Sequence, residues 1–272
     1  MNKNTTVLTN CRGTSLLEIM IALLLTGVVT AAIFQTYITQ HKNYLVQDDV
    51  TEIQQTARAT IDQLSRQIRM AGYNVPAGVN AIAASNTNPD SISVCYRPNS
   101  AKATVTTTMT SASADINTTD SISEFAIGQW AYIFHPDSGG GEWFQITGLN
   151  SESSPRRIAH AVSLSKAYVV NAQVVPMNQV TFYIDTTDKA HPNLMMRPRG
   201  QAATIYAENI SNLQFRYRIT SGAILDVPPL VKDVREVLID VTGRSRNSGT
   251  AQDSGQYRLR TYSSSVALRN VT

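Results

Sequence analysis

An N-terminal apolar run with a single acid near its start is the feature that most constrains this chain. Residues 19–34 carry no charged side chain, and Glu18 directly precedes them. An unpaired carboxylate costs roughly 2.5 to 3.5 kcal/mol at the middle of a membrane helix. Glu18 therefore needs a cation. A cut after Gly13 would supply one, because the new α-amino group of Thr14 in a neighbouring copy could lie against Glu18. Such a pair would set the stagger between subunits.

The apolar run is long enough to cross a membrane and continues into an amphipathic helix. At about 1.5 Å per residue, residues 16–38 span a bilayer core of about 30 Å. Lys3 and Arg12 precede the run and place its N-terminal end in the cytoplasm. No proline occurs in residues 14–71, and Gly72 with Pro76 predicts the stop. Beyond the membrane, apolar residues recur in steps of three and four at Val46, Val50, Ile53, Ala57, Ile61, Leu64 and Ile68.

The rest of the chain predicts an antiparallel sheet, which makes the fold class α+β. In residues 213–219 apolar and polar side chains alternate, as expected for a half-buried antiparallel strand. No second long helical pattern separates the strands. Residues 81–120 are rich in Ser, Thr, Asn and Ala, and we expect a surface excursion with little core around one strand. The expected strands cover residues 92–96, 125–134, 142–149, 161–170, 179–184, 213–219, 235–242 and 257–268.

Charge, histidine and glycine patterns give no argument for an enzyme, a metal or a cofactor. The net charge is +3, and it falls to about +1 without Lys3 and Arg12, so net charge does not predict a nucleic-acid partner. Asp185, Asp188 and Asn193 fit no calcium loop and predict a solvated turn. The glycines 139–141 lack a following Lys-Ser or Lys-Thr and predict a hairpin loop. The four histidines show no metal-ligand spacing: His41, His135, His160 and His191.

Cysteine usage excludes an intrachain disulfide in a chain cut after Gly13. Cys11 lies in the segment that would be removed, and Cys95 would be the only thiol left. A lone thiol in an exported protein is either buried and inert or paired between chains. We expect Cys95 to be buried, because residues 92–96 predict a strand.

The N-terminal segment resembles the cleavage and methylation motif of type IV pilins and type II secretion pseudopilins. That motif is a short basic leader, a glycine before the cut, mostly apolar residues, a glutamate and an apolar helix. Gly13, Leu16, Leu17 and Glu18 match it, and Thr14 stands where the family usually has a bulky apolar residue. The helix ending at residues 68–73, Ile-Arg-Met-Ala-Gly-Tyr, and the Leu-Arg-Asn at residues 268–270 resemble the PilW family of minor type IV pilins.

The resemblance implies a type IV pilin-like fold and an assembly function. Residues 1–13 would be a leader, 14–38 a transmembrane and assembly helix, 39–73 its amphipathic second half, and 74–272 a β-rich periplasmic domain. A prepilin peptidase would cleave between Gly13 and Thr14 and methylate Thr14, and Glu18 would direct assembly. The chain would sit in the inner membrane with its N-terminus in the cytoplasm, and then join other minor pilins, the major pilin and the assembly platform to prime and cap a pilus.

Three alternatives stay open. The first is a J-type pseudopilin of a type II secretion system, which shares the N-terminal motif. The second is an ordinary secretory signal, for which residues 29–31, Val-Thr-Ala, offer a small-residue cleavage site. Glu18 and the in-phase continuation of the helix argue against that signal.

The third alternative is a tip adhesin or DNA-binding pilin that uses a basic face or the Ser- and Thr-rich excursion. Arginines spaced by two point to one side of an extended strand, and neighbouring strands would combine them into a surface for DNA phosphates or for an acidic patch on a partner pilin. A solvated sheet face is the simpler explanation, and a partner pilin is preferred to DNA. The arginines are Arg216, Arg218, Arg244, Arg246, Arg258 and Arg260.

Overall fold

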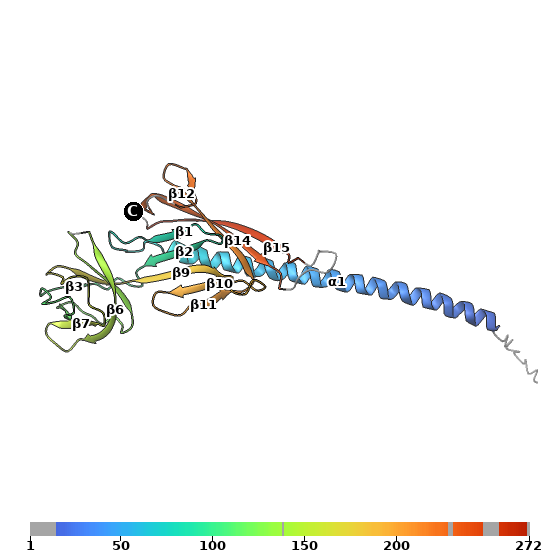
Figure 1. The fold of residues 1–272 in the computed structure, drawn as a ribbon, viewed down its shortest axis with the longest axis horizontal. Helices are drawn as coiled ribbons and strands as arrows, with labels where there is room; N and C mark the ends of the chain where they lie inside the picture. The colour runs from blue at the N-terminus through green and yellow to red at the C-terminus, as the bar shows by residue number, and fades with distance from the viewer. Residues whose placement is uncertain (1–14, 138, 228–230, 247–255, 271–272) are drawn as a thin grey trace, which may run out of the picture. The chain divides into compact units, whose positions relative to one another are not determined.

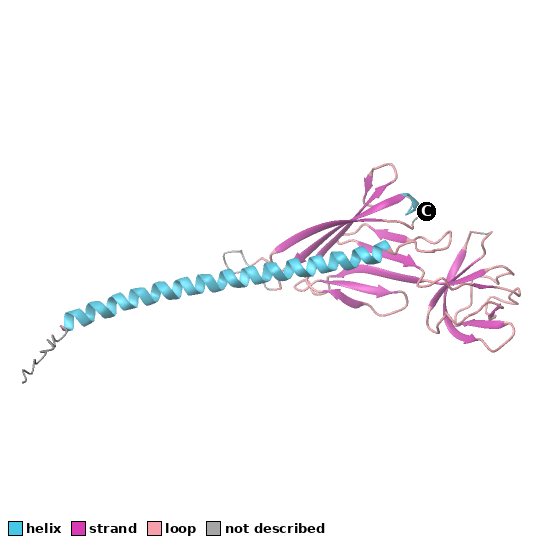
Figure 2. Cartoon of the chain, turned by 180° about the vertical axis from the view of Figure 1, so that it is seen from behind, coloured by secondary structure: helices cyan, strands magenta, loops and turns pink. Residues whose placement is uncertain are grey.

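The computed structural model describes residues 15–137, 139–227, 231–246 and 256–270 (Figure 1). The chain forms two compact units, Met1–Val50 and Thr51–Thr272. Figure 2 shows one long helix followed by strands, and every strand pair among the described residues is antiparallel. The α+β class expected from the sequence is therefore confirmed.

Helix α1 (Leu16–Arg69) is a single helix of 54 residues. It starts where the Ser15 hydroxyl oxygen accepts a hydrogen bond from the Leu17 amide at 3.3 Å, which is an N-cap. It stops before Gly72, whose φ of 77° places it in the left-handed region that ends many helices. The helix predicted for residues 14–71 thus agrees with the structure over residues 16–69.

The first unit contributes the apolar part of α1. Its most apolar window has a mean hydropathy of 2.4 and no buried residue, so this helix is long and apolar enough to cross a membrane. Threonines within it bond their hydroxyls to the helix itself. Thr26 Oγ1 donates to the Ala22 carbonyl oxygen at 2.7 Å, and Thr36 Oγ1 donates to the Ala32 carbonyl oxygen at 2.9 Å. These bonds satisfy polar groups that hydrocarbon could not satisfy.

In the second unit, the last turns of α1 pack against two sheets. One sheet has the order β1 (Ile82–Ser85), β2 (Ser91–Tyr96), β9 (Asn178–Asp185), β10 (Asn193–Pro198) and β11 (Thr204–Ala207). The other has the order β13 (Ile224–Leu225), β12 (Ile210–Ile219), β14 (Val234–Arg244) and β15 (Leu259–Ala267), and the 3₁₀ turn η1 (Val231–Asp233) leads into β14.

The helix and these two sheets share one hydrophobic core. Ala57, Leu64 and Ile68 of α1 are completely buried in it, together with Phe182 of β9. Gly243 of β14 lets the helix approach closely, because a Cβ at this position would lie 2.8 Å from Ile53 Cγ2. The three- and four-residue spacing of apolar side chains in this part of α1 therefore marks its buried face, as predicted.

Residues 97–177 form an insertion between two neighbouring strands, because β2 pairs directly with β9. The insertion carries a third sheet of order β3 (Ala103–Thr104), β8 (Gln173–Pro176), β5 (Trp130–Phe134), β6 (Gly141–Asn150), β7 (Arg156–His160) and β4 (Ile116–Thr118).

This sheet encloses a second hydrophobic core, which corrects the expected surface excursion at residues 81–120. Ala103, Val105 and Ile116 are fully buried there, and Met109 is nearly so. The Ser- and Thr-rich composition concealed these residues, because the buried apolar side chains are few and widely spaced in that stretch.

Two of the expected strands also differ in the structure. Residues 161–170 form an irregular loop, and only residues 130–134 of the segment 125–134 are a strand. Glu142 holds the loop, because its carboxylate accepts hydrogen bonds from the Ser165 amide, the Ser165 hydroxyl and the Tyr168 hydroxyl. Buried Tyr168 and Leu164 made the loop resemble a strand in sequence.

Candidate functional site

The predicted processing site is only partly described. Gly13 and Thr14, the expected cleavage and methylation residues, lie outside the described residues. Glu18 lies in the first turn of α1, where its amide donates to the Ser15 carbonyl oxygen at 3.0 Å. Its side chain is exposed, and it has no ion-pair partner among the residues that the structure describes. The assembly role expected for Glu18 stays a prediction.

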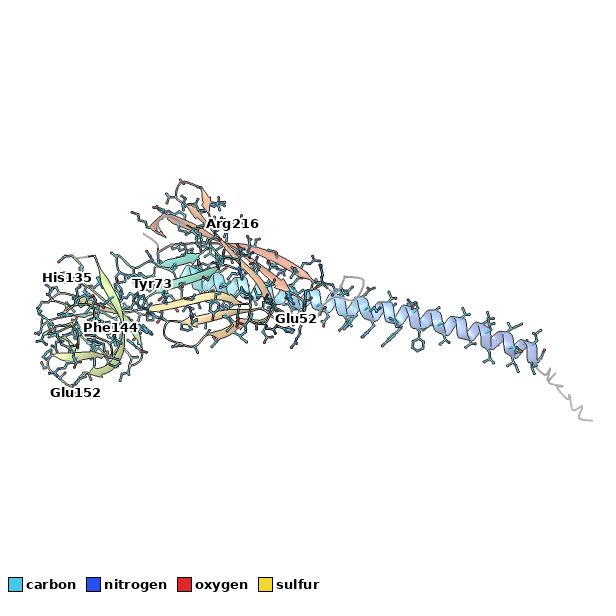
Figure 3. The ribbon with its side chains drawn as sticks, in the orientation of Figure 1. Glu52, Tyr73, His135, Phe144, Glu152 and Arg216 are labelled. Atoms are coloured by element: carbon cyan, nitrogen blue, oxygen red, sulfur yellow. The ribbon has the colours of Figure 1, made fainter. Side chains whose placement is uncertain are left out.

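Two of the predicted interaction arginines lie side by side on β12, and both are paired with acids. Arg218 Nε is 2.7 Å from Glu236 Oε2, and Arg216 Nη2 is 2.9 Å from Asp240 Oδ2. Both acids belong to β14, the neighbouring strand. Arg216 is labelled in Figure 3. This part of the sheet is therefore a cross-strand ladder of opposite charges and not a surplus of positive charge.

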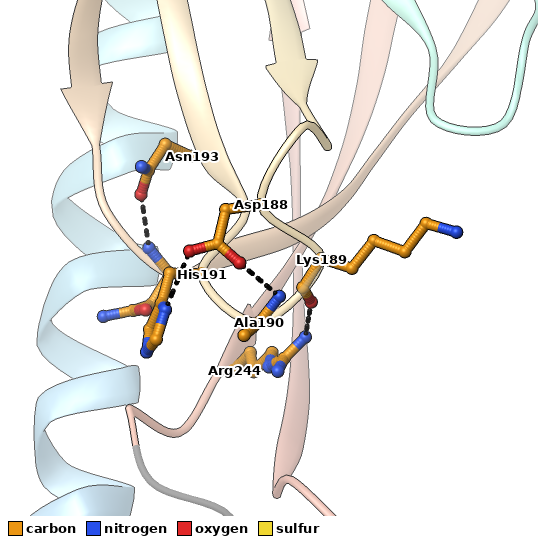
Figure 4. Close-up of polar contacts among 7 residues, drawn as sticks. Asp188, Lys189, Ala190, His191, Asn193 and Arg244 are labelled. Atoms are coloured by element: carbon orange, nitrogen blue, oxygen red, sulfur yellow. Dashed lines mark hydrogen bonds and ion pairs between the residues drawn. The ribbon is translucent and has the colours of Figure 1, made fainter.

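One of the other four arginines lies on a different surface from Arg216 and Arg218. Arg260 pairs with Gly243, which faces α1, so it lies on the opposite face of the sheet. Arg244 donates from Nη1 to the Lys189 carbonyl oxygen at 2.7 Å (Figure 4). Its guanidinium carbon lies 3.3 Å from the centre of the Tyr257 ring.

The remaining two lie at the end of the hairpin between β14 and β15. The Arg258 amide donates to Ser245 Oγ at 3.0 Å, and Arg246 is exposed. The six arginines therefore do not all lie on one face of this sheet. A binding role for the arginines stays a prediction.

The acidic turn between β9 and β10 uses its carboxylates locally. Asp185 Oδ1 accepts from the Thr187 amide at 2.9 Å, and Asp188 Oδ1 accepts from the Ala190 amide at 2.8 Å. Asp188 also contacts His191 Nδ1 at 3.1 Å (Figure 4). These bonds lower the pKa of Asp188 below its ordinary value, with the His191 contact as the largest cause. The turn predicted from the sequence is present.

The two segments that carry the PilW resemblance meet in space. A Cβ at Gly72, at the end of α1, would lie 2.9 Å from the carbonyl carbon of Asn270. Leu268 is buried, and its amide donates to the Arg235 carbonyl oxygen at 2.9 Å. Residues 268–270 therefore pack beside the end of α1. Tyr73, which follows Gly72, is 48% exposed.

Cys95 is buried on β2, as predicted, with 4% of its surface exposed. It lies in a small apolar cluster with Tyr132, Val175 and Met177, which joins the insertion to the sheet of β2. Burial raises the pKa of its thiol to about 11. The thiol is therefore protonated at neutral pH and has the character of a packing group.

The sequence patterns did not predict one polar cluster, which is centred on Arg199. Arg199 follows β10, and its guanidinium carbon lies 4.8 Å from the ring centre of Trp130 and 4.6 Å from that of Trp143. Its Nη1 donates to Gln179 Oε1 at 2.6 Å. Trp130 and Trp143 are the only tryptophans of the chain, which was the sole available signal. Nothing local in the sequence connects them to Arg199.

Scans against models of known protein families, curated proteins and solved structures found no match to this chain.

Proposed function

We propose that this chain is a minor pilin of the PilW type, which helps to initiate and cap a type IV pilus. The main support is the form of α1. Helix α1 is one uninterrupted helix. Its apolar part is exposed in the first unit of the chain, and in the second unit the helix buries Ile53, Ala57 and Leu64 in the core. An ordinary cleaved signal has no need to continue as a structural helix of the mature domain.

The proposed processing follows the N-terminal motif. A prepilin peptidase cuts after Gly13 and methylates the amine of Thr14, and these two residues are substrates of that enzyme. The mature chain then starts at the apolar helix and is held in the inner membrane with its β-rich domain in the periplasm. It leaves the membrane when it joins the filament tip with other minor pilins.

Glu18 carries the proposed assembly step. Its carboxylate pairs with the Thr14 amine of the next subunit, inside a filament core where water is absent and the attraction is weakly screened. The exposed position of Glu18 on α1 is compatible with this pair. Because the pair forms only at the correct stagger, it selects the register between subunits.

Substitution of Glu18 tests this role. We expect Glu18→Ala and Glu18→Gln to leave membrane insertion and the β-rich domain intact and to abolish incorporation into pili. The readout is the amount of this chain in sheared pili, compared with the amount in membranes. Glu52→Ala is the matched control, because Glu52 is an exposed acid on the same helix within the second unit. Normal incorporation of both Glu18 variants would refute the assembly role.

A further inference from the structure

A cleft of about 360 Å³ lies where the insertion meets the sheet of β2, β9 and β10. Its volume is at the small end of the range for ligand pockets, which is about 300 to 1,000 Å³. Its walls come from separate segments: Gln67 of α1, Tyr96 of β2, Trp130 of β5, Asn178 of β9, and Arg199 and Gln201 after β10. We call it the Arg199 cleft.

The cation of this cleft lacks a charged partner. Arg199 makes one side-chain hydrogen bond, to Gln179, and its buried Nε has no hydrogen-bond partner among the described residues. No carboxylate occurs among the described residues that line the cleft. Burial lowers the pKa of Arg199 below its ordinary value. A partly desolvated cation without an acid is costly, and a carboxylate from outside would relieve that cost.

The other polar groups of the cleft are neutral amides. The side-chain amides of Gln67, Asn178 and Gln201 make no hydrogen bond within the part of the chain that the structure describes. Each amide offers both donors and an acceptor, as a sugar hydroxyl does. The rings of Tyr96 and Trp130 supply an apolar surface for the C–H face of a sugar.

These groups also argue against other ligands. An apolar molecule would bury three amides without partners, at a cost for each. A nucleic-acid backbone needs several cations, and Arg199 is the only charged residue among the described residues that line the cleft. One cation with several neutral amides fits a ligand that carries one carboxylate and several hydroxyls.

We propose that the Arg199 cleft binds a saccharide unit that carries one carboxylate, such as a uronic or sialic acid. Arg199 takes the carboxylate, and Gln67, Asn178 and Gln201 take hydroxyls. This inference goes beyond the proposed assembly function and does not depend on it, because the cleft lies wholly in the second unit.

Intrinsic fluorescence of the full chain tests the proposal, because both tryptophans of the chain flank Arg199. The protein is held in a zwitterionic detergent, so that no sugar headgroup competes. We expect D-glucuronate or N-acetylneuraminate to change the fluorescence saturably, with a Kd of about 1 mM for so small a ligand. Methyl glucoside and N-acetylglutamate should each bind roughly 10-fold more weakly or not at all.

Variants locate the site. Arg199→Gln should raise the Kd roughly 10-fold or more, since it removes a charged hydrogen bond, and Gln201→Ala should raise it about 3-fold. Arg197→Gln is the matched control and should leave the Kd unchanged, because Arg197 is exposed on β10 and lies over Tyr183. If the Arg199→Gln chain does not fold, the Kd values of Gln201→Ala and Asn178→Ala decide whether the sugar binds in the cleft.

Three outcomes would overturn the proposal. The first is that neither acidic sugar binds. The second is that the cleft variants bind the sugars with an unchanged Kd. The third is that N-acetylglutamate binds as tightly as the sugars. The last outcome would assign the cleft to an acidic peptide segment instead.

Discussion

Replacing Gly72 with alanine should strongly destabilise the second unit. Gly72 has a φ of 77°, and an alanine in the left-handed region costs about 1 to 2 kcal/mol. Its Cβ would also lie 2.9 Å from the Asn270 carbonyl carbon, and forcing apart packed backbone costs about 1 to 3 kcal/mol. We expect a total of about 2 to 5 kcal/mol, which lowers the Tm by on the order of 10 °C for a unit of this size.

Gly222→Ala is the matched control, because Gly222 has a φ of 86° and no atom within 4 Å of an added Cβ. It should cost only the strain of about 1 kcal/mol, or about 3 °C in Tm. Thermal unfolding followed by circular dichroism in detergent measures both. The difference between the two variants isolates the contact between the helix end and the chain end. Equal losses of Tm would show that this contact is absent in solution.

Two further predictions concern titrating side chains. In a Cys11→Ser chain, Cys95 should resist iodoacetamide at pH 8 until denaturant is added, because burial raises the pKa of its thiol to about 11; rapid labelling of the native chain would contradict its burial. Hydrogen bonds from Ser265 and Arg218 lower the pKa of Glu236, so its stabilisation is full above the ordinary carboxyl pKa of about 4.3 and is lost as the pH falls through the lowered value. Glu236→Gln should therefore cost about 0.5 kcal/mol at pH 7 and nothing at low pH, as measured by urea unfolding, and a cost that is independent of pH would refute the pairing with Arg218.

The helix and the alternating strands were predictable because their signals are local. The spacing of Ile53, Ala57 and Leu64 fixes one face of a helix whatever it packs against. The alternation in residues 213–219 likewise fixes the two faces of β12, and Arg216 and Arg218 do point to one side.

The rest of the fold and of the candidate site depends on contacts between residues far apart in the sequence, which no local pattern predicts. The sequence did not reveal that β14 would place Glu236 and Asp240 beside the two arginines, because strand register is set by the whole sheet. Arg199 meets Trp130 and Trp143 only because β5, β6 and β10 are brought together by the fold. The second core was missed for a similar reason, since Ala103 and Val105 are buried by strands far along the chain.

The N-terminal mass of the protein tests the central claim most directly. The protein would be isolated from membranes of cells with and without a prepilin peptidase. We predict a mature chain that starts at a methylated Thr14 and appears only when the peptidase is present. A chain that starts at Ala32 in both strains would contradict the proposal, because α1 would then lack Glu18 and the domain would be an ordinary secreted one.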